Sequence, residues 1–316
     1  MKKFMKLLIG YDGSACADAC LSDLRRAGLP RKANALVLTV SEFWLAHAVA
    51  NANAIQMAAA QVQGPISSGA RSPTDARILA LEGKKQLQSH FPAWEIEAAD
   101  SSGSPAREIL KKAKAWGPDL IVVGCQGRSA LGRFLLGSVS QKVVNEAHCS
   151  VRVARGTAWK NGSPVRILVG FDGSAGATGA IDAISMRMWP PASEVRLITI
   201  IDSPTGSFGS PLSEAFRKDL SSAPGRIPNW IQDSLKTATE KLRGAELTVS
   251  SKCEEGDPKQ LIVANAEEWG AECIFVGASF AERQFEQLLL GSVATAVVSR
   301  AHCSVEVVRQ TPVSTS

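Results

Sequence analysis

The sequence is poor in aromatic residues, and its 7 cysteines include no CxxC pair. Tyrosine occurs once in 316 residues and aromatic residues make up 6% of the chain, so no basic cluster is interleaved with aromatic side chains as in many nucleic-acid-binding proteins. An odd number of cysteines without a CxxC pair speaks against a disulfide framework and favours a reducing compartment. We therefore expect a cytoplasmic protein without a nucleic-acid partner.

Long apolar runs are also missing. Runs such as LIVVG fall far short of the roughly 18 residues that a membrane span needs. The N-terminus MKKFMKLLIG begins like a signal peptide, but Lys6 interrupts its apolar run and Asp12 ends it without a cleavage site. We read this segment as a first strand and expect no membrane partner. Apolar residues make up 45% of the chain, which excludes a disordered protein.

Charge is divided unevenly along the chain, although the net charge is only +5. Residues 1–155 carry 20 Lys and Arg against 12 Asp and Glu, a net charge of +8. Residues 156–316 carry 15 against 18, a net charge of −3. The first half should therefore attract an anionic ligand, and the second half should not.

The chain contains an internal repeat. KLLIGYDGSACADACL recurs as RILVGFDGSAGATGAI, which places Asp172 at an offset of 160 from Asp12. The segment 137–155 recurs as 291–309 with 12 of 19 positions identical. This period is too long for a solenoid and indicates a duplicated domain. We predict one domain over residues 1–155, a linker over 156–164, a second domain over 165–309 and a tail over 310–316.

Strand-like and helix-like segments alternate within each copy. A helix is expected over Ser104–Trp116, because Pro105 suits a first turn and Gly117-Pro118 stops a helix. Ser41–Ala80 is less regular and is read as a helix followed by a loop. The alternation predicts a doubly wound α/β fold that binds ligands at the carboxyl ends of its strands. The predicted strands of the first copy are Lys6–Gly10, Ala35–Val40, Glu95–Ala99, Asp119–Gly124 and Val151–Ala154.

A carboxylate follows the first predicted strand, where Asp12 precedes Gly13 and Ser14. An acid at this position stands at the mouth of the sheet, where it could contact a ligand. The alternative is that Asp12, helped by Ser14, only caps the following helix. The motif does not decide between the two by itself.

Glycines and basic residues follow the fourth predicted strand. Gly124 and Gly127 are followed, after nine intervening residues, by the turn Gly137–Ser140, which opens a helix. Glycines let the backbone approach an anion, and a helix N-terminus offers free N–H groups to it. The two serines of the turn add hydroxyl donors, and Arg128 and Arg133 could screen phosphate charge. A tight turn with an N-cap would explain the turn alone, but not three glycines with two arginines. No Walker-type P-loop and no GxGxxG motif occurs.

These motifs resemble the universal stress protein family in its tandem form. The resemblance rests on the DGS opening, the glycine spacing and the closing AHCSV strand, and it extends from Lys6 to Arg309. It implies two tandem Rossmann-like, adenine nucleotide alpha hydrolase-like domains. Each would be a five-stranded parallel sheet flanked by helices, and the domains would pair through their last strands. The glycine spacing is typical of the family's ATP-binding branch.

The resemblance also implies a bound nucleotide, ATP or its ADP or AMP form, between strands one and four of the first copy. A Mg²⁺ ion on the phosphates is compatible with it, although no carboxylate is assigned to such an ion. The implied contacts are Asp12 and Val40 with adenine and ribose, Val123, Gly124 and Gln126 along the sugar and phosphate path, and Gly127, Gly137, Ser138, Val139 and Ser140 on the phosphates.

The second copy departs from this pattern. Phe280 replaces the middle glycine, and one extra residue lies between Gly277 and Gly291. Glu282 and Glu286 would repel a polyphosphate, which Arg283 only partly offsets. We therefore expect the second copy to bind no nucleotide and to stabilise the first through their interface. Its weaker candidate residues are Asp172, Ile200, Gly277, Gly291, Ser292 and Val293.

The leading hypothesis is a nucleotide-responsive stress-response module with an unidentified protein partner. A slow ATP hydrolase or nucleotidyl transferase is the first alternative, but Gly124–Ser140 contains no His, Asp or Glu to activate water, and no catalytic residue is assigned. A structural stress protein without nucleotide is the second alternative.

The pairs His148-Cys149 and His302-Cys303 are read as core or interface residues rather than metal ligands. A closed intrachain pseudo-dimer and a homodimer of such chains both stay open.

Overall fold

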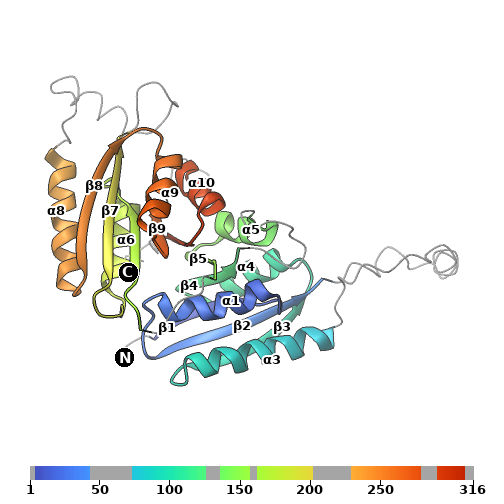
Figure 1. The fold of residues 1–316 in the computed structure, drawn as a ribbon. Helices are drawn as coiled ribbons and strands as arrows, with labels where there is room; N and C mark the ends of the chain where they lie inside the picture. The colour runs from blue at the N-terminus through green and yellow to red at the C-terminus, as the bar shows by residue number, and fades with distance from the viewer. Residues whose placement is uncertain are drawn as a thin grey trace, which may run out of the picture.

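The computed structural model describes residues 4–42, 73–125, 136–156, 162–201, 229–278 and 290–309 (Figure 1). We call residues 1–155 the first copy and residues 165–309 the second copy. The strands are β1 Met5–Gly10, β2 Ala33–Ser41, β3 Glu95–Ser102, β4 Leu120–Gly124 and β5 Ser150–Ala154, then β6 Arg166–Gly170, β7 Glu194–Ile201, β8 Thr248–Glu255, β9 Cys273–Gly277 and β10 Ser304–Val308. The helices are α1 Ala15–Asp23, the 3-10 helix η1 Leu24–Arg26, α3 Pro73–His90, α4 Pro105–Trp116 and α5 Ser138–Glu146, then α6 Ala175–Ser185, α8 Asn229–Gly244, α9 Pro258–Trp269 and α10 Ser292–Arg300.

All the strands belong to one sheet of ten, in the order β3-β2-β1-β4-β5-β10-β9-β6-β7-β8. Strands of the same copy pair in parallel, whereas β5 and β10 pair antiparallel. The predicted α/β fold with two tandem copies is confirmed; the five parallel strands of each copy are joined through the two last strands, as the resemblance implied, into one sheet. Within the first copy the chain moves outward from β1 to β3 and then returns to β4 on the other side of β1. The gap between β1 and β4 is therefore the topological switch point, where open α/β sheets bind ligands.

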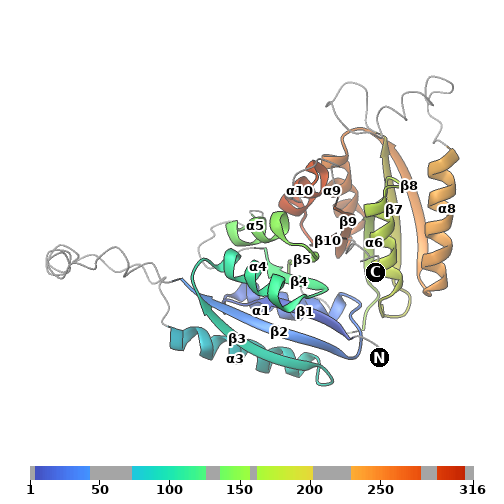
Figure 2. The ribbon, with the colours of Figure 1, turned by 180° about the vertical axis from the view of Figure 1, so that it is seen from behind.

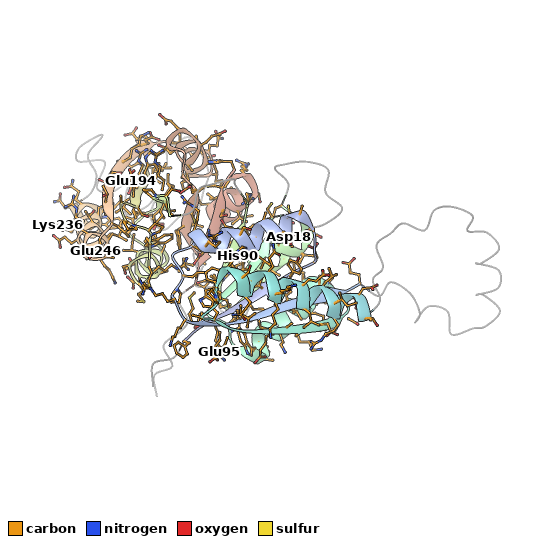
Figure 3. All side chains as sticks on the ribbon, turned by 60° about the horizontal axis from the view of Figure 1, so that its bottom comes forward. Asp18, His90, Glu95, Glu194, Lys236 and Glu246 are labelled. Atoms are coloured by element: carbon orange, nitrogen blue, oxygen red, sulfur yellow. The ribbon has the colours of Figure 1, made fainter. Side chains whose placement is uncertain are left out.

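Helices cover both faces of the sheet. In the first copy, α1 packs beside α3 on one face and α4 beside α5 on the other. Figure 3 shows the first of these faces, with Asp18 on α1 and His90 at the end of α3. In the second copy α6 packs beside α8, and α9 beside α10. Figure 2 shows the molecule from behind, with α4 in front of the strands of the first copy.

The apolar core is continuous on only one face. Side chains under α4, α5, α9 and α10 form a single cluster that includes Leu8, Val151, Val305 and Ile274. Under α1 and α3, and under α6 and α8, two separate clusters form. On that second face, the junction between the copies is filled with polar side chains instead.

Local signals explain several element ends. Helix α4 begins at Pro105 and ends at Trp116, and its C-cap Gly117 has a left-handed φ of 64°, in agreement with the predicted stop at Gly117-Pro118. Helix α3 begins at Pro73, inside the segment Ser41–Ala80, and residues 43–72 lie outside the described residues.

The prediction that both His-Cys pairs lie in the core or interface is wrong for His148, which is exposed at the corner before β5. Cys303 is buried as expected. None of the helices in the described ranges is both long and apolar enough to cross a membrane.

Candidate functional site

The candidate site lies at the carboxyl ends of β1 and β4. Ile9 pairs with Val122 in the sheet. Asp12 and Cys125 follow these paired residues by three positions each, so both stand at the same level beyond the strands. Gly10 lies close to α4, because a Cβ at this position would lie 3.0 Å from Cδ1 of Ile109. The first strand therefore ends between α1 on one face and α4 on the other.

The turn after β1 is shaped by its own side chains. The N–H of Ser14 donates to Oδ1 of half-buried Asp12 (3.0 Å), and Gly13 between them has a φ of 64°. The hydroxyl oxygen of Ser14 in turn accepts from the N–H of Ala17 (3.1 Å) and is the N-cap of α1. Asp12 thus stabilises the turn after β1, whereas the N-cap of α1 is Ser14 and not Asp12.

Hydrogen bonds join the end of β4 to the start of α5. The N–H of Gly137 donates to the carbonyl of Cys125 (2.8 Å), and the N–H of Cys125 donates to the carbonyl of Ala154 (3.1 Å). The hydroxyl of Ser140 donates to the carbonyl of Gly124 (2.5 Å). Ser140 is only 4% exposed, so its hydroxyl serves the backbone and not a ligand, unlike the hydroxyl donor that the sequence suggested.

The N-terminus of α5 has no side-chain cap. Its N-cap is Gly137, which has no side chain, and the first backbone bond of the helix runs from Gln141 N to the carbonyl of Gly137 (2.9 Å). The amides of Ser138, Val139 and Ser140 precede this bond and have no acceptor within the helix. By contrast, Ser14 caps α1. Unlike the start of α1, the helix end at the switch point therefore offers N–H groups to an anion.

The two copies differ in charge at the carboxyl ends of β3 and β8. In the first copy β3 leads to α4 through three serines, Ser101, Ser102 and Ser104, around a glycine. In the second copy the equivalent residues after an offset of 153 are all acids: Glu254, Glu255 and Asp257. Asp257 caps α9 by accepting from the N–H of Lys259 (2.9 Å), whereas Ser104 makes no side-chain cap on α4.

Other charged side chains reduce the difference in charge between the two carboxyl edges, but they do not remove it. The first copy has Glu108, whose Oε2 accepts from the hydroxyl of Ser101 (2.7 Å), and the second has Lys252 beside Glu254. The pKa of Glu254 is lowered, mainly by its hydrogen bonds from Lys252 and Asn265, so this carboxylate stays charged. The carboxyl edge of the second copy is therefore less favourable to an anion than that of the first.

The second copy keeps the geometry of the turns but not all of their side chains. The N–H of Ser174 donates to Oδ1 of Asp172 (3.0 Å), as in the first copy. Helix α10 begins after Gly291 as its N-cap, but Ala294 stands where the first copy has Ser140. Gly277 at the end of β9 packs against the backbone of Gly176, and any Cβ at Gly277 would overlap it.

The structure brings most of the predicted residues to one edge of the sheet. Val40 is partly buried at the end of β2, in register with Ser101, and Val123 is buried in β4. In the second copy Ile200 pairs with Glu254. The residues at the edge of the first copy are Asp12, Val40, Val123, Gly124, Gly137, Ser138, Val139 and Ser140. Gln126, Gly127, Arg128, Arg133, Phe280, Glu282, Arg283 and Glu286 lie outside the described residues.

Sequence reasoning missed a serine cluster at this edge. The hydroxyl of Ser41, at the end of β2, lies 2.9 Å from that of Ser102 and 3.2 Å from the carbonyl of Ser101. The signal was available, because the serines follow a predicted strand and their counterparts in the second copy are acids. Only the pairing of β2 with β3 places Ser41 among them.

A pair of thiols also lies near the end of β4. Cys125 is partly buried and interacts with Cys16 of the first turn of α1. Burial, and then the proximity of Cys16, raise the pKa of the Cys125 thiol, while Arg155 acts in the opposite direction. Cys125 is therefore protonated at neutral pH. Within the described ranges, no group of three or more His, Cys, Asp or Glu side chains could hold a metal ion.

Comparison with known proteins gives one consistent result. The family model described as "Universal stress protein family" matches residues 3–155 and again residues 165–309. Universal stress protein MJ0531 of Methanocaldococcus jannaschii is 38% identical over 85 residues, which are 25% of this chain and 50% of that protein. Universal stress protein YxiE of Bacillus subtilis is 46% identical over 61 residues, 19% of this chain and 41% of that protein. The chain thus spans about half the length of the curated relatives it matches.

Solved structures resemble the whole chain. A universal stress protein from Archaeoglobus fulgidus has a TM-score of 0.62 at 20% identity, and the match covers 98% of both chains. A protein from Pseudomonas aeruginosa, described as a putative universal stress protein, has a TM-score of 0.58 at 16% identity, with 98% of this chain and 94% of that chain covered. At this level of identity the likeness shows the tandem fold alone.

Proposed function

The chain belongs to the universal stress protein family, and we propose that its first copy binds one adenine nucleotide at the carboxyl ends of β1 and β4. The nucleotide is ATP or its ADP or AMP form. The observation that carries this proposal is the N-terminus of α5, which has Gly137 as its cap and opens at the switch point of the sheet. Two features of the first copy support it: the net charge of +8, and the serines at the carboxyl end of β3 where the second copy has acids.

The residues present fit such a ligand. The amides of Ser138, Val139 and Ser140 would receive phosphate oxygens, and Gly124 and Gly137 leave the backbone accessible there. Asp12 would accept from ribose hydroxyls at the nucleoside end, and Val40 would line the base. Gln126 and Gly127 would extend this path, with Arg128 and Arg133 balancing phosphate charge. A Mg²⁺ ion would add charge compensation on the phosphates.

The second copy is proposed to bind no nucleotide. Its edge carries Glu254, Glu255 and Asp257, and its glycine motif is interrupted by Phe280. Its role would be to hold the first copy through the β5–β10 junction. The protein as a whole would act in the cytoplasm as a module whose partner-binding state depends on nucleotide, which requires different nucleotide affinities in two states.

The first test is to denature the purified chain and identify the released nucleotide by mass spectrometry, quantified per chain. About one nucleotide per chain is expected. Two per chain would contradict the assignment of the second copy, and ADP or AMP after loading with ATP would support slow hydrolysis. No released nucleotide, together with no heat of binding for added ATP and Mg²⁺, would overturn the proposal and leave a structural stress protein.

A variant pair tests the glycine assignment. Gly127→Val should abolish binding of the nucleotide, because a branched side chain would occupy the space of the phosphates. Phe280→Gly is the matched change in the second copy, and it should not restore binding there because the inserted residue and the acids remain. Unchanged affinity in Gly127→Val would refute the phosphate assignment.

A further inference from the structure

The strands that join the two copies are almost identical in sequence. Ser150–Arg155 reads SVRVAR and Ser304–Arg309 reads SVEVVR, so they differ at two positions. One difference is Ala154 against Val308. The other is a charge reversal, Arg152 against Glu306. In the antiparallel pairing Arg152 lies directly opposite Glu306, so the local two-fold axis that relates the copies passes through this pair.

The reversed charges lie on the buried polar face of the junction. Valines from both strands fill the apolar face: Val151, Val153, Val305 and Val307. Arg152 is 1% exposed and Glu306 is 0% exposed, on the opposite face. Two fully buried charges at one register position are costly unless each finds a partner.

Each of these charges has a partner in its own copy and another across the junction. Arg152 Nε lies 2.7 Å from Oδ2 of Asp23 in α1, and Arg152 Nη1 lies 3.4 Å from Oε2 of Glu306. Glu306 also pairs with Arg187, which follows α6. Burial alone would lower the pKa of Arg152, but Asp23, with Cys273 and Glu306, raises it above its ordinary value. The signs along Asp23, Arg152, Glu306 and Arg187 alternate.

Several other contacts between the two last strands and the helices beside them are the same in both directions, although the hydroxyl of Ser304 also donates to Oδ1 of Asp23 (2.7 Å) in one direction only. Arg155 Nη2 donates to the carbonyl of Val298 in α10, and Arg309 Nη2 donates to the carbonyl of Val144 in α5, each at 2.5 Å. These arginines occupy equivalent positions in the repeat. Such symmetric contacts, like the valine pairs, would form equally well between two first copies or two second copies.

The pair of Arg152 and Glu306 would not form between two like copies. Two first copies joined through β5 would place Arg152 opposite a second Arg152, and two second copies joined through β10 would place Glu306 opposite a second Glu306. Like charges buried at contact distance repel strongly. Only the pairing of a first copy with a second copy puts opposite charges on the axis.

We propose that Arg152 and Glu306 select the partner strand of the junction, so that β5 accepts only a last strand with an acid opposite Arg152. The occupant is the second copy of the same chain, because the short linker keeps its β10 at a high effective concentration. This pair therefore closes the chain on itself and rejects pairing of like copies between chains.

Complementary charge reversals in the full chain test this selection. Arg152→Glu places two glutamates on the axis and Glu306→Arg places two arginines there, so each single variant should lose the closed junction and melt about 10 °C lower. When the two variants are co-expressed with different tags, the native pair can form again between chains, from Glu306 of one and Arg152 of the other. A 1:1 heterodimer is expected by native mass spectrometry. Lys142→Glu, at an exposed pair with Glu146, is the control and should stay a monomer with little change in melting temperature.

If the single variants are too unstable to purify, soluble protein that appears only on co-expression, as the 1:1 heterodimer, supports the selection. Closed monomers with wild-type melting temperatures, or no heterodimer from the co-expressed variants, would overturn it and assign the choice of partner strand to the remaining contacts between the copies.

Discussion

The hydroxyl of Ser140 donates to the carbonyl oxygen of Gly124 over 2.5 Å and so ties the first turn of α5 to the end of β4. Both residues belong to the candidate nucleotide site, and the bond fixes the direction of the backbone amides in the first turn of α5. The second copy has Ala294 at the equivalent position and lacks this bond.

We expect Ser140→Ala to weaken nucleotide binding about fivefold and to lower the free energy of unfolding by about 1 kcal/mol, the usual contribution of one buried hydrogen bond. Calorimetric titration and urea unfolding measure the two effects. Ala294→Ser in the second copy is the matched control and should leave the affinity unchanged. Equal affinities for Ser140→Ala and the wild type would show that this bond does not position the amides.

Asp12→Asn should separate the two roles of Asp12. The asparagine Oδ1 can still accept from the N–H of Ser14, so the turn and the melting temperature should be kept. The loss of the charged acceptor should weaken nucleotide binding about tenfold. Asp172→Asn makes the same change in the second copy and should not alter affinity. An affinity equal to that of the wild type would mean that the carboxylate acts only in the turn.

Ser104→Asp should move stability and affinity in opposite directions. An aspartate at the N-cap of α4 can cap the helix as Asp257 caps α9, which should stabilise the protein by about 1 kcal/mol. The same negative charge at the carboxyl edge should weaken nucleotide binding. Thermal unfolding and calorimetry are the measurements. Unchanged binding would show that the ligand lies too far from α4 to sense this charge.

Stability should fall at alkaline pH because of buried thiols. Burial raises the pKa of Cys20 and Cys303, and it raises the pKa of Cys273 to about 11. Each folded thiol binds its proton more tightly than the unfolded one, whose pKa is near 8.5. The stabilisation is therefore complete below about pH 8.5 and is lost above it, with a slope of about 1.4 kcal/mol per pH unit for each thiol. Urea unfolding between pH 7 and 10 measures this slope. Cys20→Ala should make the slope shallower, and an unchanged slope would exclude this thiol as a source.

The sequence predicted those features that depend on local signals or on the repeat. Pro105 and Gly117 define α4, and the repeated DGS and glycine motifs locate the edge where the site lies. It could not predict the use of Ser140, because a hydroxyl in a first turn can face either a ligand or a neighbouring strand. The opposition of Arg152 and Glu306 depends on the register between strands more than 150 positions apart. The opposite charges of Arg152 and Glu306 at equivalent positions of two nearly identical segments could be seen in the sequence. That the two side chains lie opposite each other could be known only from the strand pairing.

The pairing of β5 with β10 also determines which strands are left at the ends of the sheet. The two outer strands are β3 and β8, so neither apolar last strand has an unpaired edge. Both outer strands are rich in acids, with Glu95 and Glu97 in β3 and Glu254 and Glu255 in β8. Open strand edges invite further strands to add, and charged side chains oppose this. The duplication thus yields a wide sheet whose ends resist edge-to-edge aggregation.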